Sequence, residues 1–145
     1  MFTRIVVGTD GSQTARRAVT LAGELARRFD AELHVVNGFR DPEAQHDADF
    51  TDVAPRSAQA SIWRQASEDV LSGVLGDSSL DGVKVETHSV VGAASDVIIT
   101  VAVRVGADLI VVGNRGMQGP DRSAESVPNS VAHRAPCHVL VAKTT

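Results

Sequence analysis

The stretch Ile5-Val6-Val7-Gly8-Thr9-Asp10-Gly11-Ser12 combines a strand, a turn and a helix cap within one short segment. Three β-branched residues closed by a glycine are typical of a strand buried on both faces of a parallel sheet. Ser12 is suited to cap the helix that follows, because apolar residues recur from Ala15 to Phe29 at spacings of three and four. This segment therefore predicts the start of a chain in which strands and helices alternate.

The rest of the chain continues the alternation. We predict further strands at residues 30–37, 83–88, 109–112 and 138–142, and further helices at 56–75, 97–105 and from 127 onward. Residues 109–112 are the most apolar strand and belong at the sheet centre, whereas residues 83–88 alternate apolar and polar side chains as an edge strand does. The pattern predicts a single domain, 1–145, with a doubly wound, mainly parallel five-stranded sheet and helices on both faces.

Two of the connecting segments lead to more local expectations. Residues 40–55 carry four aspartates, one glutamate and few large apolar side chains, so we expect a mobile surface loop. In the helix at 56–75, an apolar residue recurs every fourth position, which predicts the buried stripe of that helix. The stripe consists of Ile62, Ala66, Val70 and Val74.

Composition and charge exclude several classes of protein. The 145 residues are 43% hydrophobic and 22% charged, as in an ordinary soluble globular domain. A formal net charge of -4 argues against broad binding to nucleic acid or to an anionic membrane, and the longest apolar stretch, residues 97–105, is too short to span a bilayer. The single cysteine, Cys137, excludes an internal disulfide, and no signal peptide is recognisable, so we expect a cytoplasmic protein.

Two segments are candidates for a ligand site. In open parallel sheets, ligands bind beyond the carboxyl ends of the strands, where the winding direction reverses. Residues 8–12 follow the first strand and residues 113–119 follow the fourth, and glycines in both allow a close approach of backbone N–H groups to an anion. The glycine spacing matches neither the Walker loop nor the dinucleotide fingerprint. Taken alone, each segment also has the residue types of an ordinary connecting turn, which needs no ligand.

Other chemically active side chains give weaker signals. We interpret Cys137 as a small core residue, because it stands at the start of a strand. His133 and His138 lack a partner acid or a metal-ligand spacing, and the aspartates of residues 40–55 are interpreted as a solvated loop. No general base or catalytic lysine accompanies the glycine segment, so we expect no enzyme, or at most slow ATP hydrolysis.

Taken together and in this order, residues 5–12, 106–116 and 126–141 resemble the universal stress proteins, and the resemblance covers nearly the whole chain. It implies the strand order 3-2-1-4-5, which places Asp10 and Gly113 on opposite walls of one crevice. It also implies a cytoplasmic regulator that binds ATP or AMP, with Mg²⁺ as an optional further ligand, and that forms a homodimer. The implied cofactor-binding residues are Thr9, Asp10, Val36, Gly113, Gly116, Glu125, Ser126 and Val127.

By this resemblance, each part of the nucleotide has its own contacts. Asp10 would contact the ribose or adenine region, and Val36 would line the base pocket. Gly113 and Gly116 would belong to the phosphate loop. The helix that begins at Ser126 and Val127 would complete the phosphate cradle.

The sequence departs from the family pattern at Glu125. This residue stands where the family has a third glycine, and only eight residues separate it from Gly116. Two like charges near 4 Å repel by about 1 kcal/mol in water and about 4 kcal/mol at an effective dielectric of 20, so we predict a weakened phosphate site. Three arrangements would offset this repulsion: neutralisation of the phosphate by Arg115 and Arg122, a Glu125 side chain that points to solvent, or a divalent cation that bridges Glu125 to the phosphate. The alternative is an interaction module without nucleotide on the same scaffold, acting through its dimer surface or the acidic loop.

The last predicted strand, residues 138–142, favours self-association. In the implied strand order it lies at an edge of the sheet, and its side chains are mainly apolar. An exposed apolar edge presents unpaired backbone groups to a second copy of the chain. We therefore expect a homodimer joined at this strand, and no partner protein is identifiable from the sequence.

Overall fold

The computed structural model describes residues 1–40, 56–115 and 126–145, and at positions 56 and 57 the backbone alone. The predicted acidic loop and the candidate residues Gly116 and Glu125 lie outside these ranges. Strands and helices alternate through the described parts as the sequence predicts. The elements are β1 (Arg4–Gly8), α1 (Gln13–Phe29), β2 (Glu32–Phe39), α2 (Arg56–Leu75), η1 (Ser78–Leu80), β3 (Val85–Val91), α3 (Ala94–Val105), β4 (Leu109–Gly113), α4 (Val127–Arg134) and β5 (His138–Ala142).

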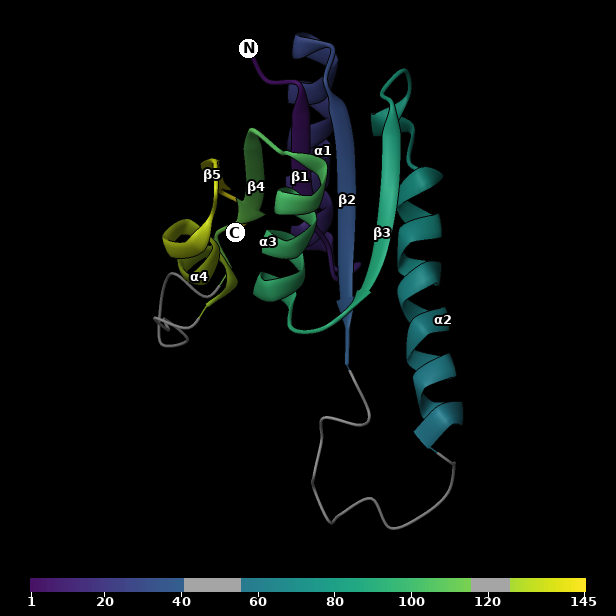
Figure 1. The fold of residues 1–145 in the computed structure, drawn as a ribbon. Helices are drawn as coiled ribbons and strands as arrows, with labels where there is room; N and C mark the ends of the chain where they lie inside the picture. Colours follow the sequence, from purple (N-terminus) through teal and green to yellow (C-terminus); the bar gives the residue numbers. More distant parts are fainter. Residues whose placement is uncertain (41–55, 116–125) are drawn as a thin grey trace.

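The five strands form one parallel sheet in the order β3-β2-β1-β4-β5 (Figure 1). One apolar layer joins α1 and α2 to the sheet, and a second layer joins α3 and α4 to its other face. Helices thus cover both faces, and the winding direction reverses between β1 and β4. This arrangement confirms the predicted doubly wound fold and its strand order.

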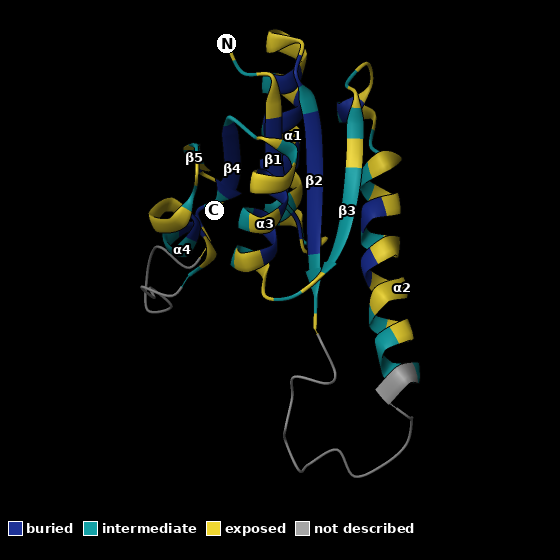
Figure 2. Cartoon of the chain, in the orientation of Figure 1, coloured by how far each residue is buried: buried dark blue, intermediate teal, exposed yellow. Residues whose placement is uncertain are grey.

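Burial falls from the centre of the sheet toward its edges (Figure 2). Ile5, Val6 and Val7 of β1 and residues 109–112 of β4 are buried, whereas every residue of β3 is partly or fully exposed. Alternate residues of β1 enter opposite layers, because Ile5 and Val7 pack toward α1 while Val6 packs toward α3. The predicted central and edge strands are therefore confirmed. Cys137 packs against the α3 layer, and burial raises the pKa of its thiol.

Helix ends follow the predicted capping residues. The Ser12 hydroxyl accepts a hydrogen bond from the Ala15 backbone N–H at 3.2 Å and so caps α1. At the other predicted boundary, Gly106 has a φ of 66° and ends α3 in the left-handed conformation. Here its backbone N–H returns to carbonyl groups of the last turn, which a glycine allows without steric cost.

The predicted buried stripe of α2 is wrong at Ile62 and Ala66, whereas Val70 is partly buried and Val74 packs against the apolar layer below α1. Ile62 is 61% exposed and Ala66 is exposed, while the buried positions are Ser67 and Leu71. A spacing of four residues drifts by about 40° per repeat around a helix of 3.6 residues per turn, so the stripe leaves the contact face. A polar residue takes part in the actual contact, because the Ser89 hydroxyl donates to the Ser67 hydroxyl at 2.7 Å.

Two predicted boundaries also shift. β3 begins at Val85 and continues to Val91, beyond the expected residues 83–88, because the longer β2 pairs with it as far as Phe39. The helix α3 begins at Ala94, before its first fully buried residue. Within the described ranges, none of the helices has the length and apolar character needed to cross a membrane.

Candidate functional site

A cavity of about 370 Å³ lies beyond the carboxyl ends of β1 and β4, at the reversal of the winding direction. Its walls come from the β1–α1 turn, the end of β2, the start of α3, the end of β4 and the start of α4. Five of the predicted site residues line this crevice. They are Thr9, Asp10, Val36, Gly113 and Val127.

The β1–α1 turn is held rigidly by hydrogen bonds to β2. The Thr9 backbone N–H donates to the Val36 carbonyl at 2.9 Å, and the Asn37 side-chain amide donates to the Thr9 carbonyl at 2.6 Å. Gly11 takes a φ of 82°, and its N–H donates to the Thr9 hydroxyl at 3.1 Å. Thr9 therefore shapes the turn, while the left-handed conformation explains the glycine that follows Asp10.

Asp10 presents an ionised carboxylate at the mouth of the crevice. Its Oδ1 accepts a hydrogen bond from the Ser12 N–H at 2.9 Å, and its Oδ2 lies 3.8 Å from Arg115 Nη1. Partial burial acts to raise the pKa of Asp10, but the hydrogen bonds from Ser12 and the charge of Arg115 outweigh it and lower the pKa. The carboxylate is thus a hydrogen-bond acceptor for ligand hydroxyl groups at neutral pH.

An apolar floor lies below this carboxylate. Val36 is 1% exposed and packs with Ile98 and Val112 in the layer between the sheet and α3. Ala15 and Ala18 of α1 continue the apolar lining on the opposite side. Small and branched apolar side chains leave a dry surface of the kind that accepts a flat aromatic ring.

The end of β4 is fixed by the C-terminal residues. Asn114 Oδ1 accepts hydrogen bonds from the Thr144 N–H at 2.9 Å and from its hydroxyl at 3.2 Å, and Arg17 Nη1 donates to the Thr144 carbonyl at 2.7 Å. A Cβ on Gly113 would lie 3.1 Å from Thr144 Oγ1. The turn after β4 is therefore packed closely on one side, and a side chain at Gly113 would crowd the crevice.

The predicted residues of the α4 start divide into two groups. Val127 lines the cavity together with Pro128, whereas Ser126 occupies the N-cap position just outside its lining. Ser126 Oγ is buried and has no hydrogen-bond partner among the described residues. Gly116 and Glu125 lie outside the described residues, so the consequence of the Glu125 charge stays a prediction.

Sequence reasoning missed several residues that shape the crevice. Ile98 and Ala18 belong to helices whose apolar periodicity showed only that they face the sheet. Thr144 follows the last strand, where no motif marked it. Asn37 stands at the end of β2 and contributes through its amide, a role that a lone asparagine does not indicate in a sequence.

The fold and the crevice define a class: doubly wound α/β proteins whose ligand cavity lies where the sheet reverses direction. Within that class, the model of the universal stress protein family matches residues 1–143. The chain belongs to the universal stress protein family, which confirms the resemblance seen in its sequence.

Individual relatives span nearly the whole chain. A universal stress protein of Mycobacterium tuberculosis is 33% identical over 147 residues, which cover 99% of this chain and 98% of the relative. Among solved structures, UspA from Lactobacillus plantarum is 28% identical with a TM-score of 0.74, covering 97% of each chain. A universal stress protein solved in complex with cAMP is 30% identical with a TM-score of 0.67, covering 99% of this chain and 98% of that one.

Proposed function

We propose that this universal stress protein binds an adenine nucleotide in the crevice and acts in the cytoplasm as a nucleotide-responsive regulator, without being an enzyme. One observation carries the proposal: the Asp10 turn, the Gly113 turn and the apolar floor at Val36 line a single cavity. A volume of about 370 Å³ lies within the usual range for small-molecule sites. The cAMP complex of a relative with 30% identity supports the choice of an adenine nucleotide.

The described residues supply a group for each part of such a ligand. The apolar lining around Val36 and Val112 would cover the base, and the Asp10 carboxylate would accept hydrogen bonds from the ribose. The phosphate would lie toward Gly113 and Arg115, near the buried, unpartnered hydroxyl of Ser126. The positive end of the α4 helix dipole, at Val127 and Pro128 in the crevice lining, favours an anion there.

Magnesium fits this site only together with the nucleotide. Mg²⁺ in proteins is held by one or two carboxylates and by phosphate oxygens of the substrate. Within the described part of the lining, Asp10 is the one carboxylate, and its Oδ2 faces Arg115 at 3.8 Å. We therefore propose that any Mg²⁺ is bound with the phosphates of ATP rather than by the protein alone.

Glu125 would then make the site discriminate by phosphate charge. A carboxylate near the phosphate subsite repels ATP more strongly than AMP or cAMP, which carry fewer negative charges. The natural chain should accordingly prefer the nucleotides with less charge. Replacing Glu125 by glycine should reduce this preference, because ATP gains the most from the loss of the carboxylate.

The test is calorimetric titration of the natural chain and Glu125→Gly with ATP, AMP and cAMP, each with and without Mg²⁺. We expect the substitution to strengthen ATP binding about fivefold or more, and cAMP binding by less. Glu68→Gln, an exposed charge change on α2, is the control and should alter neither affinity. Equal ATP affinity in the natural chain and in Glu125→Gly would overturn the role of Glu125. The absence of nucleotide binding in both proteins would overturn the proposed ligand and favour the module without nucleotide.

We also propose a homodimer joined at β5, because this edge strand combines apolar side chains with unpaired backbone groups. Val141 is 39% exposed, and Val127 of the neighbouring α4 is 36% exposed. Covering such an edge with a second copy removes both apolar surface and unpaired N–H and C=O groups from water. Analytical ultracentrifugation at micromolar concentration should show a dimer that Val141→Asp converts to monomer, and a purely monomeric natural chain would contradict the proposal.

A further inference from the structure

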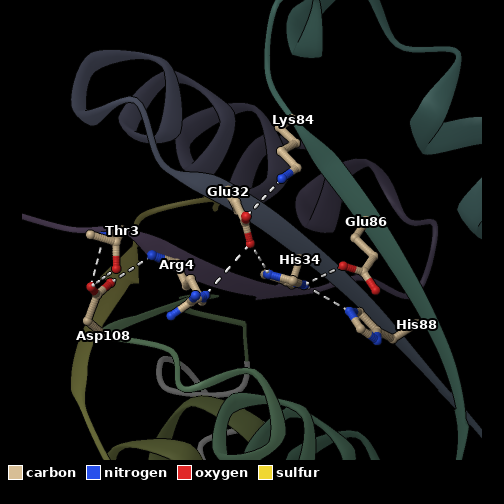
Figure 3. A network of polar contacts seen from close by, with 8 residues as sticks. All are labelled: Thr3, Arg4, Glu32, His34, Lys84, Glu86, His88 and Asp108. Carbon is tan, nitrogen blue, oxygen red and sulfur yellow. Dashed lines mark hydrogen bonds and ion pairs between the residues drawn. The ribbon is translucent and has the colours of Figure 1, made fainter.

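A group of polar side chains lies on the sheet face that α3 covers, along the pair β2 and β3 (Figure 3). His34 is paired in register with Glu86, and Val36 with His88. Because residues two apart on a strand share a face, Glu86 and His88 both project beside His34. The pairing thus assembles two imidazoles and a carboxylate from positions that are far apart in the sequence.

The distances within this group are those of a preformed ligand set. His34 Nδ1 lies 3.0 Å from His88 Nε2 and 3.7 Å from Glu86 Oε2. One ligand atom from each residue fits within a separation of 4.8 Å. Two nitrogens bound to one tetrahedral Zn²⁺ are about 3.3 Å apart, since each Zn–N bond is about 2.0 Å. The two nitrogens are therefore within a few tenths of an ångström of this separation, whereas the Glu86 carboxylate must move closer to complete the ligand set.

A second carboxylate faces the opposite side of the His34 ring. Glu32 Oε2 lies 3.4 Å from His34 Nε2, a charge contact rather than a well-aligned hydrogen bond, and Nε2 has no other polar partner among the described residues. Glu32 is itself held by Lys84 at 3.0 Å and Arg4 at 3.7 Å. A proton on Nε2 would face the Glu32 carboxylate and would leave the Nδ1 lone pair directed toward His88 and Glu86 (Figure 3).

The group combines a buried residue on β2 with an exposed residue on β3, an arrangement that suits ion binding. The side chain of His34 is 3% exposed, so its position is fixed by packing, whereas that of Glu86 is 68% exposed on the edge strand. An ion can reach the group from the solvent side of β3. Arg104 of α3 also acts electrostatically on His88, and its positive charge opposes the binding of a cation.

We propose that His34, Glu86 and His88 form a binding site for a divalent transition metal of the Zn²⁺ class, with Glu32 as a positioning residue. Two imidazole nitrogens and one carboxylate, with water completing the tetrahedron, are a ligand set that zinc accepts. Mg²⁺ and Ca²⁺ prefer oxygen ligands and do not match it. The described lining of the crevice shares no residue with this site, so the inference does not depend on the proposed nucleotide function.

The experiment titrates Zn²⁺ into the whole chain after removal of metals with a chelator, and follows binding by calorimetry. We expect one Zn²⁺ per chain. Glu32→Gln should weaken binding by about 10- to 100-fold, as loss of a carboxylate behind a ligating histidine does, and His88→Asn and Glu86→Gln should each weaken it at least about 100-fold. Substituting Co²⁺ should give the visible absorption bands of a tetrahedral site, and His88→Asn should remove them.

Control variants separate this site from incidental binding. His133→Asn and His138→Asn remove exposed histidines outside the group and should leave the Zn²⁺ affinity unchanged. Glu86→Gln alters an exposed side chain, so it decides the question if His88→Asn fails to fold. Undetectable Zn²⁺ binding by the natural chain, full affinity in Glu86→Gln, or loss of affinity in a control variant would each overturn the proposal.

Discussion

The crevice and the histidine group lie on the same sheet but are built in different ways. The crevice forms where strands end, from the turn at Asp10 and the turn at Gly113, and backbone geometry shapes it. The histidine group forms within two paired strands, and the register of β2 against β3 brings its side chains together. Turns restrict residue type and so leave a mark in the sequence, whereas a strand position accepts almost any residue until its partner is known.

The strongest test of this difference is to fill the crevice at Gly113. In Gly113→Val, the Cβ would lie 3.1 Å from Thr144 Oγ1, and the methyl groups would enter the cavity. At about 2 kcal/mol for overpacking, nucleotide binding should weaken about 30-fold, measured by calorimetry. Zn²⁺ binding should not change. Gly73→Val is the control, because a Cβ there meets nothing within 4 Å. Unchanged nucleotide affinity in Gly113→Val would remove Gly113 from the site.

A smaller effect is expected from Asp10→Asn. The substitution retains an oxygen that can accept from the Ser12 N–H but removes the charge that ribose hydroxyls would meet. Losing one hydrogen bond to a charged group should weaken AMP binding about tenfold, again measured by calorimetry. Asp81→Asn changes an exposed charge elsewhere and serves as the control. The same AMP affinity in Asp10→Asn as in the natural chain would show that the carboxylate does not contact the ligand.

The smallest effect concerns Asp108, at the opposite end of the β1–β4 pair from the crevice. Its carboxylate accepts hydrogen bonds from the Thr3 N–H at 2.8 Å, the Thr3 hydroxyl at 2.9 Å and the Arg4 N–H at 3.2 Å (Figure 3). Burial acts to raise the pKa of Asp108, but these hydrogen bonds outweigh it and lower the pKa. The folded state therefore gains stability that is present above the ordinary carboxyl pKa and is lost as the pH falls through the folded-state pKa.

Asp108→Asn should lower the free energy of unfolding at pH 7 by on the order of 1 kcal/mol, after allowance for solvent screening. At about pH 3 the natural carboxyl is closer to its lowered folded-state pKa, so the difference between the two proteins should be smaller than at pH 7. Urea unfolding of both proteins at both pH values measures this difference in the free energy of unfolding. A difference of the same size at both would contradict the assignment, and nucleotide and Zn²⁺ affinities should be unaffected throughout.

Local features of the fold could be read directly from the sequence. The Ser12 cap, the end of α3 at Gly106 and the buried strand β4 each depend on a few adjacent residues whose conformational preferences are strong. The order of the strands came only from the family resemblance, since alternating elements do not fix which strands are neighbours. Asp10 and Gly113 were recognisable as candidate site residues because both stand in turns after apolar strands, and both line the crevice.

Long-range features could not be read in the same way. The contact face of α2 was misassigned because a buried serine, Ser67, takes part in it through its partner Ser89. Thr144 reaches the crevice only because Asn114 holds the chain there. His34 and His88 are separated by 54 residues, and their meeting depends on the register of β2 against β3. None of these contacts leaves a local pattern, so pairing must be known before they can be inferred.

The central place of β1 has a consequence for synthesis on the ribosome. Ile5 emerges before its partner Leu109 on β4, which follows more than a hundred positions later. Before α3 and β4 have emerged, a nascent chain in which β1, β2 and β3 are paired leaves the open side of β1 and the apolar surface around Val6 and Val36 uncovered. Such an incomplete sheet exposes unpaired backbone groups at one edge and an apolar face, and both can associate with other chains. This partly folded intermediate is therefore the stage of synthesis at which a bound chaperone would cover the most exposed apolar surface and unpaired backbone.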